Sequence, residues 1–195
     1  MLQRSGMHQV LLSLSEQLEM VTQAAYELVV CGGAALQALG FVDRTTRDVD
    51  VLAIADGMLP TLLSADPLPE AIITAAHLVA RDYNLQADWL NGGPTDLLSQ
   101  GLPEGLTSRW HTVRYGKLLT VHFIGRIDQI CFKTYAAING GADRHLSDLL
   151  VLNPTDDEML LAARWCLTQD ASEVFPQIAK SFLKKVGWNH IAELV

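Results

Sequence analysis

The sequence predicts an α/β fold, with a small sheet packed against helices in the N-terminal part and only helices in the C-terminal part. Short apolar runs bounded by Gly, Pro and Asp occur in the first 125 residues and are typical of buried strands. From residue 126 onward the apolar residues follow helical spacing instead. The chain has 195 residues, 49% of them hydrophobic, which is enough for one core. We therefore expect an α/β part over 1–125 and a helical region over 126–195 packed on it, as two parts or as one compact domain.

Helices and strands alternate along the first half of the chain. Apolar residues at helical spacing predict amphipathic helices, the first of which would cover one face of the sheet. Gly40 ends a short helix, and Asp56-Gly57 closes the second strand. The predicted elements are a helix ending near Ala25, a strand over 28–31, a helix over 33–39, a strand over 48–54 and a helix over 68–83.

The next segment combines a short strand, a loop and a hairpin. Residues 87–91 predict a brief strand, because Gly and Pro follow at once. The polar segment 94–104 predicts a loop long enough to close over a bound substrate. Strands over 110–115 and 118–124, joined by Gly116-Lys117, predict a hairpin.

The remaining residues predict helices. Thr155 and Glu158 form a capping box, which marks the start of a helix. An apolar stripe follows and stops at Gly187. The predicted helices cover 127–138, about 146–150, 156–167 and 175–186, with a short piece over 188–195.

Two glycines and two aspartates form the most informative pattern in the chain. The strand over 28–31 runs into Gly32-Gly33, where missing side chains let a phosphate approach backbone N–H groups at a helix start. Asp48 and Asp50 alternate with Val49 on a strand, so both carboxylates point the same way with Cα atoms roughly 6.6 Å apart. That spacing suits a shared divalent metal. The pattern indicates a triphosphate and Mg²⁺ site, and the alternative is a buried strand with a capping glycine and carboxylates that merely end the strand.

Charge and cysteine content narrow the class of protein. The net charge is −8, and no basic run exceeds two residues, which disfavours a non-specific nucleic-acid binder. The three cysteines are scattered among apolar residues without a Cys-x-x-Cys arrangement, which favours reduced core thiols in a cytoplasmic protein. The N-terminus lacks the apolar run of a signal peptide, and no segment reaches membrane-spanning length. We expect a cytoplasmic protein with no membrane partner.

The order of strand, Gly32-Gly33, helix and Asp48-Val49-Asp50 resembles the polymerase-β-like nucleotidyltransferase superfamily. The resemblance implies a small mixed sheet flanked by helices. A second pattern, Lys133-x-x-Ala136 followed by Arg144 and Asp148-Leu149, resembles the AbiEii-type toxins and related branches of that superfamily. Together the two patterns extend the resemblance from about residue 27 to about 165. It implies that Lys133 and Asp148 lie beside the nucleotide.

The resemblance also implies an activity. It would be a Mg²⁺- or Mn²⁺-dependent transfer of an NMP group from an NTP to a protein or nucleic-acid hydroxyl, with Asp48 and Asp50 as metal ligands. The role would be toxin-like or in phage defence, with an antitoxin-like partner protein. The alternative is a module that retains the fold and binds nucleotide or a protein partner without catalysis.

Several further residues have two possible interpretations, one functional and one structural. Active members of the superfamily add a third carboxylate, for which Asp88 ranks first and Asp128 second, because Asp is also a favoured N-cap residue. Thr45 and Arg47 would contact the triphosphate or belong to a solvated turn. Lys133 would meet a phosphate as a point charge or act as a base, unless it is a surface lysine. Asp148 alternatively pairs with Arg144 on the same helix.

Overall fold

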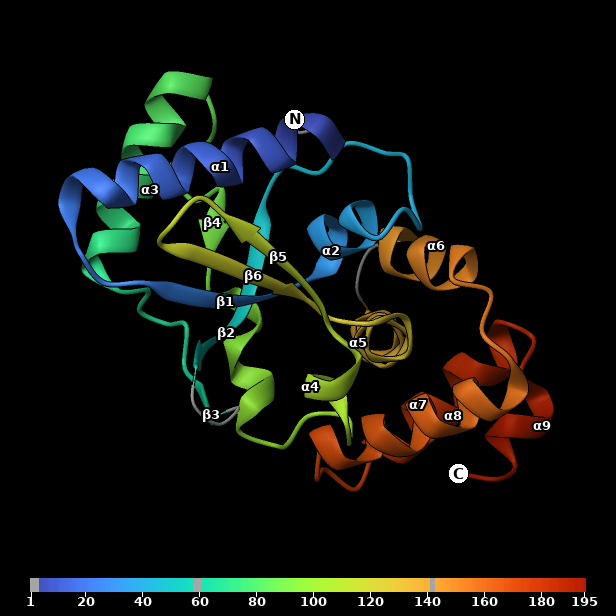
Figure 1. Ribbon diagram of the computed structural model, residues 1–195. Helices are drawn as coiled ribbons and strands as arrows, with labels where there is room; N and C mark the ends of the chain where they lie inside the picture. The colour runs from blue at the N-terminus through green and yellow to red at the C-terminus, as the bar shows by residue number, and fades with distance from the viewer. Residues whose placement is uncertain (1–3, 58–60, 141–142) are drawn as a thin grey trace. The chain divides into compact units, whose positions relative to one another are not determined.

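The computed structural model describes residues 4–57, 61–140 and 143–195 (Figure 1). It divides into two units, one of residues 1–99 with 107–124 and the other of residues 100–106 with 125–195. The first unit contains the sheet, and the second consists of helices and their connections.

The first unit is built on a mixed sheet, which confirms the predicted fold class. Over the described ranges the sheet has six strands in the order β3-β2-β1-β6-β5, and β4 pairs with β2. The central strand β1 runs antiparallel to β2 and parallel to β6. The strands are β1 (Tyr26–Cys31), β2 (Val49–Asp56), β3 (Thr61–Leu63), β4 (Leu90–Asn91), β5 (His111–Tyr115) and β6 (Leu119–Phe123).

Strand β2 has two partners along one edge, because β4 pairs with its first residues and β3 with its last. In this register Asp50 lies opposite Cys31, the last residue of β1, and opposite Asn91 of β4. The end of β1, the start of β2 and the short strand β4 therefore meet at one place, and the acidic residues lie there.

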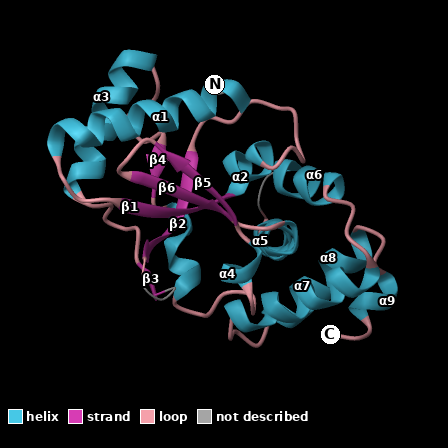
Figure 2. Ribbon diagram, in the orientation of Figure 1, coloured by secondary structure: helices cyan, strands magenta, loops and turns pink. Residues whose placement is uncertain are grey.

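Helices α1 (Arg4–Val21), α2 (Gly32–Ala38) and α3 (Glu70–Tyr83) enclose the main core with the sheet (Figure 2). Leu14 of α1 packs in the same buried cluster as Leu28 and Val121 of the sheet, which confirms that the first helix covers a sheet face. This helix ends at Val21 rather than near Ala25. The physical reason is a local turn, in which Thr22 Oγ1 accepts a hydrogen bond from the Ala24 N–H at 3.1 Å.

The hairpin of β5 and β6 also follows the prediction. Leu119, Val121 and Phe123 of β6 belong to the core cluster. The alternate residue His122 is also buried, because Nε2 lies 2.9 Å from Glu27 Oε2 and Nδ1 lies 2.8 Å from Thr112 Oγ1. Both ring nitrogens of this buried side chain thus have hydrogen-bond partners.

Two predictions around residues 87–104 need correction. The expected strand over 87–91 is confined to β4, because the Trp89 N–H bonds to the Gln86 carbonyl in a turn. The expected loop over 94–104 is interrupted by a 3₁₀ helix, η1 (Gly93–Leu98), and is followed by α4 (Leu106–Arg109). Pro94 at the start of η1 favours this helix, since its fixed backbone angle suits a first turn.

The helices of the second unit match the predicted segments. They are α5 (Arg126–Ile138), α6 (Asp143–Val151), α7 (Asp156–Gln169), α8 (Phe175–Lys185) and α9 (Asn189–Ala192). The capping box of α7 is present, with Thr155 and Glu158 bonding reciprocally.

The three cysteines are buried, as expected for core thiols. Among the described residues no helix combines the length and apolarity that a membrane crossing requires.

Arg126 connects three helices of this unit. Its guanidinium donates hydrogen bonds to the carbonyls of Leu152 and Asn153, at 2.6 and 2.9 Å, just after α6. The same group pairs with Glu158 of α7, and this hydrogen bond holds the pKa of the Glu158 carboxyl below its usual value. Two carbonyl groups that follow α6 thereby gain a hydrogen-bond donor.

We expect Gly92→Ala to destabilise the first unit, because a Cβ at this position would lie 2.2 Å from the Ala65 carbonyl oxygen. Backbone atoms on both sides cannot yield easily, so the expected loss is about 1–3 kcal/mol in the free energy of unfolding. Gly6→Ala in α1 is the matched control, since a Cβ there meets nothing within 4 Å. Urea unfolding followed by circular dichroism would measure both, and equal midpoints would contradict the close approach.

Candidate functional site

The carboxylate of Asp50 lies directly over Gly32. A Cβ at Gly32 would be only 2.4 Å from Asp50 Oδ2, and Gly32 has a positive φ of 68°. Both facts require glycine at this position. The glycine that follows β1 therefore leaves the space in which the acid of β2 lies.

Asn91 is a second neighbour of Asp50. Its Nδ2 donates a hydrogen bond to Asp50 Oδ1 at 3.4 Å, while its Oδ1 accepts one from the Gly93 N–H at 3.0 Å. The amide is thus held at one end and contacts the acid at the other. Sequence reasoning missed Asn91, because only the parallel pairing of β4 with β2 brings it to the site.

Asp48 stands just before β2 and is positioned by Thr46. The buried Thr46 hydroxyl lies 3.1 Å from the Asp48 carbonyl oxygen and 3.4 Å from its carboxylate. The same loop is attached to α2, since Gln37 Nε2 donates to the Arg44 carbonyl at 2.8 Å. The half-buried Thr45 lies between these two attachments. The segment before the acidic strand is therefore anchored on both sides of Thr45, and Arg47 is exposed.

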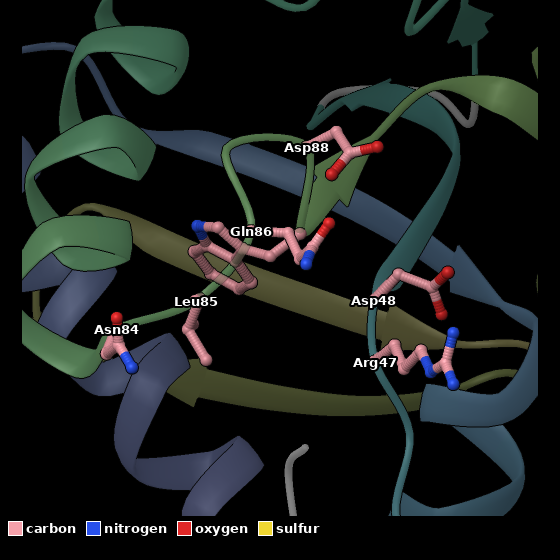
Figure 3. A pocket seen from close by; sticks show the side chains of 7 residues that line it. Arg47, Asp48, Asn84, Leu85, Gln86 and Asp88 are labelled. Carbon is pink, nitrogen blue, oxygen red and sulfur yellow. The ribbon is translucent and has the colours of Figure 1, made fainter.

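Asp48 and Asp88 line the same pocket, of about 740 Å³. Figure 3 shows Arg47 and Asp48 side by side on the segment that leads into β2, and Asp88 on the segment that leads into β4. The two segments are joined by a hydrogen bond from the Val49 N–H to the Trp89 carbonyl at 2.6 Å. The structure thus brings the predicted residues Arg47, Asp48 and Asp88 together, with Asp88 exposed to solvent.

Lys133 and Asp148 belong to the second unit, where they form a buried ion pair. Lys133 Nζ lies 2.9 Å from Asp148 Oδ2, and the two side chains are 6% and 3% exposed. The alternative of a surface lysine is therefore wrong. Because each charge neutralises the other, the pair would be costly to break by removing one partner.

Asp128 is not the N-cap of α5, contrary to one of its two readings. Gly125 holds that position, and Asp128 is fully buried in the first turn of the helix, within the second unit. An acid in the first turn is favoured by the helix dipole.

We refer to Asp48 and Asp50 together as the acidic site. Their donor atoms suit a hard divalent cation. Asp48 and Asp50 offer carboxylate oxygens, which Mg²⁺ and Mn²⁺ prefer. Within the described parts of the chain, no group of three or more His, Cys, Asp or Glu side chains is arranged to hold a metal ion. The described residues therefore provide two carboxylates with an amide beside one of them.

A strand leading into a Gly-Gly helix start, with an acidic strand paired beside it, is the arrangement of a nucleotidyltransferase-type site. A family model described as "Nucleotidyltransferase of unknown function (DUF6036)" matches residues 9–140, more than half of the chain. The chain belongs to this family, and hence to the nucleotidyltransferase superfamily. Comparisons with the curated proteins and with the solved structures found no match.

We expect Gly32→Ala to displace the Asp50 carboxylate and to weaken Mn²⁺-dependent NTP binding about tenfold or more. Gly140→Ala is the matched control, because Gly140 also has a positive φ but a Cβ there meets nothing within 4 Å. Both variants should lose about 1–2 kcal/mol from backbone strain, so only the difference in binding reports on Asp50. Calorimetry of NTP binding with Mn²⁺ would decide, and equal affinities would contradict the role of the contact.

The two substitutions Asn91→Ala and Asn91→Asp should have opposite effects on Mn²⁺ binding. Asn91→Ala removes the hydrogen bond to Asp50 and should weaken binding, with a loss of stability of about 1–2 kcal/mol. Asn91→Asp places a further carboxylate beside Asp50, which should raise Mn²⁺ affinity and destabilise the metal-free protein by like-charge repulsion. Mn²⁺ titration by electron paramagnetic resonance would measure both. Unchanged Mn²⁺ affinity in both variants would show that Asn91 does not act on Asp50.

Proposed function

We propose that the protein is a divalent-metal-dependent nucleotidyltransferase that moves an NMP group from an NTP to a hydroxyl of a protein or nucleic acid. Membership of the nucleotidyltransferase family supports this proposal. The observation that carries it is the position of the Asp50 carboxylate over Gly32, where β1 gives way to α2, with Asp48 two residues earlier at the pocket. This geometry combines carboxylates with the backbone of a Gly-Gly helix start.

Each of these residues has a proposed task. Asp48 and Asp50 would hold Mg²⁺ or Mn²⁺, and the ion when bound neutralises charge on the phosphates and on the leaving pyrophosphate. Gly32 and Gly33 would leave room for a phosphate beside the backbone N–H groups of the helix start. Arg47, exposed at the pocket, would bind a phosphate oxygen, and the neighbouring Thr45 would add a hydroxyl donor.

The reaction is an in-line displacement at the α-phosphorus. The acceptor oxygen forms a bond to this phosphorus, the bond to the bridging oxygen breaks, and pyrophosphate leaves with that electron pair. The proton of the acceptor hydroxyl would pass to the Asp88 carboxylate. Asp88 suits this task because it is exposed and lines the same pocket as Asp48.

The finer assignments rest on the resemblance to AbiEii-type toxins. They are a nucleotide contact by Lys133 and Asp148, a toxin-like or phage-defence role in the cytoplasm, and an antitoxin-like partner protein.

A non-catalytic nucleotide-binding module is the second candidate. It is favoured by the neutral Asn91 beside Asp50, and by the lack of a three-acid group among the residues described. This module would bind an NTP with Mg²⁺ and release no pyrophosphate.

Asp50→Asn and Asp48→Asn should each reduce NMP transfer by about 100-fold or more, because each removes a negative oxygen ligand of the metal. The assay follows label from each α-labelled NTP into lysate components with Mg²⁺ or Mn²⁺. Asp56→Asn is the matched control, since Asp56 is an exposed acid at the opposite end of β2. Full activity of Asp50→Asn would contradict the proposal, and NTP binding without transfer by the unmodified protein would favour the second candidate.

Asp88→Asn should lower the rate of transfer while leaving metal-dependent NTP binding unchanged, because the proposed task of Asp88 concerns the acceptor proton alone. A pH profile of the transfer rate would show loss of its acidic limb in this variant. If Asp88→Asn weakens NTP binding as much as Asp50→Asn does, Asp88 is a ligand rather than a base.

A further inference from the structure

Two adjoining hollows form a groove that leads away from the acidic site. The pocket that contains Asp48 and Asp88 shares Asn84 and Leu85 with a second hollow of about 550 Å³. The second hollow extends along the last turns of α3, past Arg81 to His77. We refer to the two hollows together as the α3 groove.

The segment 84–89, which connects α3 to β4 and lines the α3 groove, has a backbone fixed by hydrogen bonds. Asn84 adopts a left-handed conformation at the end of α3, and the Leu85 N–H bonds to the Ala80 carbonyl at 2.8 Å. Trp89 is fully buried, and its Nε1–H donates to the Ala76 carbonyl at 3.0 Å. The exposed side chains of Asn84 and Gln86 are thus presented by an anchored segment.

Charge in the α3 groove does not suit the long run of phosphates in a nucleic-acid strand. The two arginines that line it are balanced by Asp48 and Asp88, and Arg81 Nη2 also pairs with Asp82 at 2.8 Å. The negative end of the α3 dipole lies at the same place. Nucleic-acid binding depends on an excess of positive charge, which neither this groove nor the chain, with its net charge of −8, provides.

The uncharged groups of the groove suit a polypeptide. Each of the side chains of Asn84 and Gln86 carries one carbonyl acceptor and one NH₂ donor, the same pair that a peptide group presents. Leu85 between them is half-buried and offers an apolar contact. We propose that the α3 groove binds a protein segment and delivers its Ser, Thr or Tyr hydroxyl to Asp88 as the acceptor, an inference that rests on the proposed function.

The test offers two acceptors to the full-length protein with labelled NTP and Mn²⁺. One is a degenerate library of unstructured peptides with a central Ser, Thr or Tyr, and the other is a short RNA with a free 3′ hydroxyl. The groove variant is the double substitution Asn84→Gly and Gln86→Ala, in which Gly keeps the left-handed backbone of residue 84. Gln23→Ala, at an exposed glutamine that does not line the groove, is the control.

We expect label on the peptides, with a KM for peptide raised about tenfold in the groove variant through the loss of hydrogen bonds. The KM for NTP and the metal-dependent NTP affinity should not change. Transfer to RNA with inert peptides would overturn the inference, as would an unchanged peptide KM in the groove variant. Asp50-dependent NTP binding without labelling of either acceptor would also overturn it, whereas loss of NTP binding altogether would instead remove the proposed function itself.

Discussion

The acidic site depends on one close approach, that of the Asp50 carboxylate to the Cα of Gly32. A partly buried carboxylate loses hydration, and the loss must be offset by polar neighbours. Asn91 supplies one of these polar neighbours, because the pairing of β4 with the first residues of β2 brings it beside Asp50. Because Gly32 also starts α2, the same contact fixes where the helix begins relative to the acidic strand. Strand register, helix start and acid position are thus three aspects of one packing arrangement.

The three acids around this arrangement differ in their polar contacts, and Asp88 is more exposed than Asp48 and Asp50. Asp50 contacts the amide of Asn91 within the sheet, Asp48 contacts the Thr46 hydroxyl at its edge, and Asp88 is open to solvent. Acids that differ in exposure are suited to different tasks, with the more enclosed ones as ligands and the open one for proton exchange. The proposed roles follow that order. Asn91 matters for the choice between enzyme and binding module, because it decides how much negative charge surrounds Asp50.

Local signals in the sequence were sufficient for the elements that build the site, and non-local pairing explains what they left out. Gly32-Gly33, the acidic strand and the Thr155 capping box each lie within one element and its flanks, so their patterns could be recognised. Asn91 meets Asp50 across 41 residues of sequence, and no local pattern encodes such a pairing. Lys133 could not be recognised as buried until α6 brought Asp148 to it. Asp128 shows a different kind of error, in which a local signal misleads. Aspartate is a favoured N-cap residue, but the N-cap of α5 is Gly125, three positions before Asp128.

The parallel pairing of β1 with β6 has a consequence for how the protein is made. Residues 26–30 of β1 must wait for residues 119–123 before the central strand gains its second neighbour. Until that stretch has left the ribosome, one edge of the central strand stays open to other chains. Contacts of such long sequence separation also slow folding. A chain truncated before residue 119 would therefore expose this edge permanently, and nascent chains at that stage would be the form most dependent on chaperones.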